Sequence, residues 1–141
     1  MANTVIEPID LGTFISQING IVQAPVPEAN GAVTTCPRTE PDRWDEMIKR
    51  LIGLRNLQED WDGMGAKAPK AALIDSALDL AVQLRQQGFR HPSRVGAGPD
   101  GEILLEWQDD HLYLEAEISA PHSTEWMLAI DDQRPKHWVT R

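Results

Sequence analysis

The sequence predicts an α+β fold in which two helices pack on one face of a three- or four-stranded antiparallel meander, behind a partly disordered N-terminal arm. Three observations lead to this prediction. Apolar residues recur every three or four positions in the first half of the chain, and from residue 94 onward they alternate with polar ones. Five of the ten prolines fall within residues 1–41. A chain of 141 residues suffices for one domain with a hydrophobic core.

The N-terminal arm, residues 1–41, combines a short amphipathic segment with a proline-rich linker. The segment spans about residues 10–22, and Asp10 is its candidate N-cap. Its apolar side chains recur at helical spacing: Leu11, Phe14, Ile15 and Ile18. A helix this short is marginal in water, so we expect it to dock on another surface. The linker, 23–40, is small, polar and interrupted by proline, which favours neither helix nor central strand.

The compact domain is predicted over residues 42–133 and opens with two helices. Asp42 is placed to cap a helix over about 43–58 with a continuous apolar stripe. A second helix is predicted over 69–87, and Gly88 follows it where a left-handed residue commonly ends a helix.

Strands follow the helices, with turn residues between them. The alternating segments are 102–107, 112–118 and 125–130, with 94–97 as a possible fourth strand at the edge. Tryptophans at 107 and 126 fall in the apolar phase, as Trp44 does on the first helix, so we expect all three in the core. Residues 134–141 form a basic C-terminal tail outside this pattern.

Acidic residues are concentrated on the predicted sheet. The chain has 13 Lys and Arg against 22 Asp and Glu, for a formal charge of −9. Residues 95–133 contain ten of the acids and no Lys or Arg. Such a balance argues against direct binding to nucleic acid or an anionic membrane, both of which select basic surfaces.

The alternation places this charge on the face of the sheet away from the helices. The residues predicted there are Glu102, Leu104, Glu106, Tyr113, Glu115, Glu117, Glu125 and Met127. One interpretation is a solvated face that maintains solubility and protects the edges. The other is a docking surface for a basic protein, with apolar anchors in an acidic field. Phe14 and Ile18 of the N-terminal segment are further candidate partner-binding residues.

Catalytic, cofactor and metal sites are not expected. None of the four histidines has another three or four residues away, and the single Cys36 lies in the linker. Asp60 and Asp62 begin a calcium-loop pattern, but later oxygen ligands are missing. Here Trp61 is expected to fill the corner between the helices, and Asp62 to bind turn amides.

Three motifs together resemble those of a broad group of small bacterial proteins. They are WDGMGA (61–66) followed by proline, PDGEILLEW (99–107) and LYLEAEI (112–118), in the order helix, WDGxGA, helix, PDGxIxLEW, LExEI. The resemblance covers about residues 48–130. It implies a bacterial or phage origin and a shared α+β fold, and it implies no activity.

These observations favour a non-enzymatic, cytoplasmic interaction protein with a basic protein partner. The class expected is a small bacterial inhibitor, antitoxin-like or immunity-like protein, or an accessory factor. One alternative is an anti-defence protein of a phage or mobile element, of the anti-CRISPR type, that mimics nucleic acid. The other is a structural homodimer. The N-terminal arm suits a segment that folds on its target.

Overall fold

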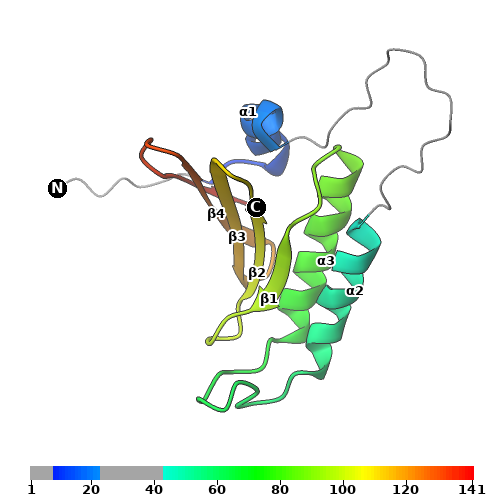
Figure 1. The fold of residues 1–141 in the computed structure, drawn as a ribbon. Coiled ribbons are helices and arrows are strands. Elements are labelled where there is room, and N and C mark those ends of the chain that lie inside the picture. Colours follow the sequence, from blue (N-terminus) through cyan, green and yellow to red (C-terminus); the bar gives the residue numbers. More distant parts are fainter. Residues whose placement is uncertain (1–7, 23–42) are drawn as a thin grey trace, which may run out of the picture.

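The structure is a computed structural model that describes residues 8–22 and 43–141. These residues form a layer of helices on one face of a five-stranded antiparallel sheet (Figure 1), which confirms the predicted α+β class. The predicted linker, Cys36 and the Asp42 cap lie outside the described residues. The helical elements are α1 Leu11–Val22, α2 Trp44–Gly53, the 3-10 turn η1 Leu54–Asn56 and α3 Ala71–Gln86.

Helices α2 and α3 lie close to the predicted positions. The predicted first helix is divided, because α2 tightens into η1 and the chain is extended again at Leu57. Helix α3 ends as expected, with Gly88 at φ 81°. There the Gly88 N–H donates to the Arg85 carbonyl and the Phe89 N–H to the Leu84 carbonyl, at 3.1 and 2.9 Å. This pattern satisfies carbonyls that the helix end would leave unpaired.

The strands pair in the order of the sequence, as a simple meander. They are β1 Arg94–Ala97, β2 Ile103–Gln108, β3 Leu112–Ala120, β4 Ser123–Ile130 and β5 Lys136–Thr140. The fifth strand differs from the expected basic tail. Trp138 pairs with Trp126 of β4, so the tail completes the sheet. Pro135 and the shortness of this segment obscure its alternation in the sequence.

Helix α1 docks on the chain's own core. The Ile9 N–H donates to the Val139 carbonyl at 2.8 Å, which ties the start of α1 to β5. Asp10 caps the helix as predicted, because its carboxylate accepts the Thr13 N–H at 2.9 Å. The Phe14 ring lies 4.2 Å from that of Trp126, centroid to centroid. The surface that this marginal helix needs is therefore supplied within the chain.

All three helices cover the same face of the sheet, here called the inner face (Figure 1). The largest buried side chains of the inner face are Trp107 and Trp126, and Trp44 is also buried, so all three expected core tryptophans are in the core. The opposite, outer face has no described helix over it. No described helix combines the length and the apolar character that a membrane span requires.

We expect Phe14→Ala to lower the free energy of unfolding by about 3 kcal/mol, because it removes a fully buried ring and leaves a cavity against Trp126. Urea denaturation followed by tryptophan fluorescence measures the change. Ser16→Ala, at an exposed position on the same helix, is the matched control and should change little. Equal stability of the two variants would show that α1 does not pack on the core in solution.

Candidate functional site

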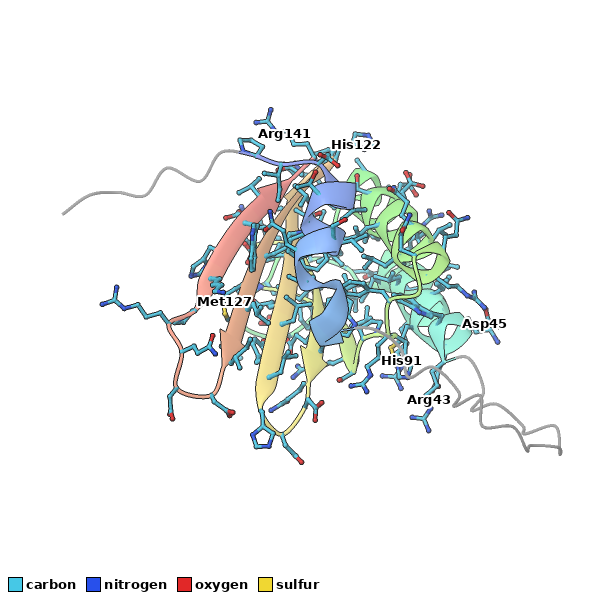
Figure 2. All side chains as sticks on the ribbon, turned by 90° about the horizontal axis from the view of Figure 1, so that it is seen from above. Arg43, Asp45, His91, His122, Met127 and Arg141 are labelled. Atoms are coloured by element: carbon cyan, nitrogen blue, oxygen red, sulfur yellow. The ribbon has the colours of Figure 1, made fainter. Side chains whose placement is uncertain are left out.

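The outer face is ordered into cross-strand rows by the strand register. One row runs through Arg94, Glu106, Glu115, Met127 and His137, from β1 to β5. Because directly paired residues share a face, these side chains project together on the side away from the helices. Figure 2 shows Met127 on that side.

A second cross-strand row on the outer face also contains glutamates: Leu104, Glu117, Glu125 and Val139. Tyr113 lies on the same face of β3, two residues before Glu115. Together the two rows and Tyr113 hold seven of the eight sheet residues that the sequence predicted for this face. The eighth, Glu102, precedes β2.

Two pairs of glutamates stand directly opposite each other on neighbouring strands: Glu106 with Glu115, and Glu117 with Glu125. Like charges at this distance destabilise a sheet. None of the four makes an ion pair within the part of the chain that the structure describes. The repulsion is therefore not compensated by described cations in contact with these carboxylates.

The pKa of Glu117 is raised by this environment. Partial burial is the first cause, and the charges of Glu102 and Glu125 follow. The neighbouring Tyr113 hydroxyl donates to Glu115 Oε2 at 2.9 Å. Burial, and then this hydrogen bond, raise the pKa of Tyr113 far above its ordinary value, so the phenol remains a neutral donor. The face thus combines crowded carboxylates with one aromatic ring held in place.

Glu102 has a structural role in the β1–β2 turn. Its carboxylate accepts the Asp100 N–H at 2.9 Å and lies over Gly98. A Cβ atom on residue 98 would collide with this carboxylate. Its side chain is therefore engaged in the hairpin, and we place it at the border of the outer face.

Phe14 and Ile18 are not available as partner-binding anchors in this structure. Both are in the core cluster, with exposed fractions of 0% and 1%. Both lie on the buried side of α1, as their helical spacing predicts, but an amphipathic pattern does not reveal whether the covering surface belongs to the same chain or to a partner.

The loop between η1 and α3 is organised by its own carboxylates. Asp62 Oδ1 accepts the N–H groups of Met64 and Ala66 at 2.8 and 3.0 Å, as predicted, and these bonds lower the pKa of Asp62. Asp60 Oδ1 accepts the Gly65 N–H at 2.6 Å. Gly63 and Gly65 have positive φ, 76° and 87°. These hydrogen bonds from backbone amides to Asp60 and Asp62 account for the conformation of the loop without a bound cation.

This loop also contacts the β1–β2 turn, so two of the motifs noted in the sequence meet in space. The Lys67 N–H donates to the Pro99 carbonyl at 2.9 Å. Gly101, at φ 86°, lies so close that a Cβ there would be 3.2 Å from the Ala68 carbonyl oxygen. The contact joins the helical layer to the end of the sheet.

Trp61 differs from its predicted role. It does not fill the corner between the helices: 37% of it is exposed, and its indole N–H donates to the Lys67 carbonyl at 3.0 Å. Met64, at the tip of the same loop, is 85% exposed. The sequence could not distinguish a packed from a surface tryptophan here, because the loop has no periodicity.

Metal-binding groups of three or more His, Cys, Asp or Glu are not found among residues 8–22 and 43–141. Of the histidines, His111 lies 3.2 Å from Asp131, an exposed pair at the sheet end. The chain matches no known protein-family model, no curated protein and no solved structure.

We expect Glu117→Gln to raise the free energy of unfolding at neutral pH by about 0.5 kcal/mol, because it removes one charge from a like-charged pair. The folded-state pKa of Glu117 is raised, so its charged form destabilises the fold above that pKa. The gain should therefore vanish as the pH falls below the ordinary value of 4.5, where wild type is protonated too. Urea denaturation of wild type and variant from neutral pH to below 4.5 measures this gain, and Asp132→Asn, at an exposed position, is the control. A gain that is independent of pH would contradict the charge explanation.

Asp62→Ala should lower the urea midpoint, because two loop amides lose their acceptor. Asp62→Asn retains one side-chain oxygen and should fall between alanine and wild type. Since the folded pKa is lowered, wild type should lose this stabilisation as the pH falls below 3.8 and through the folded pKa. Met64→Ala, in the same loop, should change nothing. Equal midpoints for Asp62→Ala and wild type would show that the loop does not need this carboxylate.

Proposed function

We propose that this chain is a non-enzymatic interaction module whose outer face binds a basic protein partner. The observation that carries the proposal is the pair of like-charged cross-strand contacts, Glu106 with Glu115 and Glu117 with Glu125, on a sheet face without a described helix over it. A face serving solubility alone would gain stability by interspersing lysines among these acids.

The chemistry of the face suits a cationic partner. Lysine or arginine side chains placed between the glutamate pairs would turn repulsion into attraction, and the concentrated charge would accelerate encounter. Leu104, Tyr113 and Met127 are partly buried side chains between the acids and supply apolar contact. Interfaces of this kind depend on a few apolar or aromatic anchors surrounded by polar groups.

We place the module among small bacterial inhibitors of the antitoxin or immunity type, or accessory factors. An acidic sheet can cover a basic functional surface on its target and so block it. The resemblance in the three motifs supports a bacterial or phage origin. If the covered surface binds nucleic acid, the same contact amounts to nucleic-acid mimicry, and competition by DNA or RNA for the captured partner would identify that case.

The decisive experiment compares capture by two charge-reversed baits. Glu115→Lys with Glu117→Lys changes the outer face, whereas Asp110→Lys with Asp132→Lys makes the same change of net charge in exposed turns. We expect wild type and the turn variant to retain one basic protein from the native host at low salt and to release it at high salt. The outer-face variant should fail to retain it.

Circular dichroism of both variants establishes that they are folded. Retention of the same protein by both variants would contradict the proposal. Sedimentation of wild type as a dimer at low and high salt, with no heterologous partner, would assign the face to a homodimer instead.

A further inference from the structure

A small pocket opens at the end of the sheet where α1 begins, on the helical side and apart from the outer face. Its volume is about 110 Å³. Polar residues from α3, the β3–β4 turn and the last two strands line it: Ser76, Asp79, Gln83, His122, Thr124 and Thr140. Arg141 lies at its rim, and Figure 2 shows it beside His122.

This pocket collects every buried polar side chain of the described part of the chain. Ser76, Thr124 and Thr140 are 8%, 6% and 3% exposed, and no other described polar residue is buried. Thr124 and Thr140 are direct cross-strand partners, and Ser76 comes from α3, which packs over the inner face. Buried hydroxyls from three separate elements therefore converge on one cavity.

The hydroxyl groups lack acceptors for their protons among the described residues. Thr140 Oγ1 accepts the indole N–H of Trp126 at 2.9 Å, and Ser76 Oγ accepts the His122 N–H at 3.1 Å, but neither donates in turn. The Thr124 hydroxyl makes no hydrogen bond to any described residue. Buried polar groups in folded proteins are nearly always paired, so these three donors are available to an acceptor in the cavity, either water or a ligand.

The charges at the pocket mouth define the ligand further. The three hydroxyls and the Arg141 guanidinium suit a carboxylate, because each is a donor and the guanidinium is cationic. Asp79, exposed on α3 at the same mouth, disfavours a simple anion and suits an ammonium group. The formal charge of −9 for the whole chain also disfavours a net anion.

We propose that this pocket binds a small α-amino acid, with the carboxylate toward the three hydroxyls and the ammonium toward Asp79. A zwitterion presents both charges a short distance apart and is neutral overall. The cavity volume limits the ligand to the smallest side chains. This site is independent of the outer face, so either proposal can fail without the other.

The test is a titration of the intact chain with glycine, alanine and serine, followed by the backbone amide signals of His122 and Thr124 in NMR. Acetate, methylamine and inorganic phosphate are the comparison probes. We expect saturable shifts with the amino acids, weaker binding of acetate, and none with methylamine or phosphate. Phosphate or acetate binding as tightly as glycine would overturn the zwitterion assignment, and no saturable shift with any amino acid would overturn the site.

Two variants separate the contacts. Thr124→Val keeps the shape of the side chain and breaks no hydrogen bond within the described residues, so the fold should persist while affinity falls about tenfold or more. Asp79→Asn should remove the preference for glycine over acetate. Unchanged glycine affinity in Thr124→Val, or an unchanged preference in Asp79→Asn, would contradict the proposed orientation. Glu117→Gln, on the outer face, should bind glycine as wild type does.

Discussion

A line of aromatic rings across the inner face holds the two layers together. Phe14 of α1 lies against Trp126, Trp126 against Trp107, and Trp107 against Phe89 after α3, with centroid distances of 4.2, 5.9 and 5.7 Å. The indole N–H groups of three tryptophans also donate hydrogen bonds, which fix the orientation of the rings. Trp107 donates to the Arg90 carbonyl at 2.7 Å, Trp126 to Thr140 at 2.9 Å, and the neighbouring Trp138 to Gln17 at 3.1 Å. Each bond satisfies a polar group beside the core. The first and third tie the segment after α3 and helix α1 to the sheet, and the second joins β4 to β5.

This one-sided core determines what the outer face can be. Since side chains alternate along a strand, placing the tryptophans inward sends Glu106, Glu115, Glu117 and Glu125 outward. The inner face supplies enough buried apolar surface for the sheet to tolerate repulsion on the other side, where each like-charged pair costs a fraction of a kcal/mol. The inner face of the strands thus supplies the stability of the fold, and the outer face of the same strands displays the acidic side chains.

The same division explains the position of the small pocket. Thr124 is the inward-facing residue next to Trp126 on β4, and it pairs with Thr140 of β5. Their hydroxyls lie between the first turn of α1 and the exposed flank of α3, so the core ends in polar groups instead of more apolar side chains. At the same end of the sheet, the contact between Lys67 and Pro99 joins the loop before α3 to the β1–β2 turn.

Local periodicity in the sequence was sufficient to determine the α+β class, the positions of α1 and α3, the three central strands and which residues of those strands face outward. It could do so because the repeats of 3.6 and 2 residues are local properties of the chain. Tertiary structure alone decided that residues 136–140 form a fifth strand, that Phe14 and Ile18 belong to the chain's own core, that Trp61 is partly exposed, and that three hydroxyls meet in one pocket. Those features depend on which distant segments pair, and the strand partner of Trp138 or the surface covering α1 is not encoded in any local pattern.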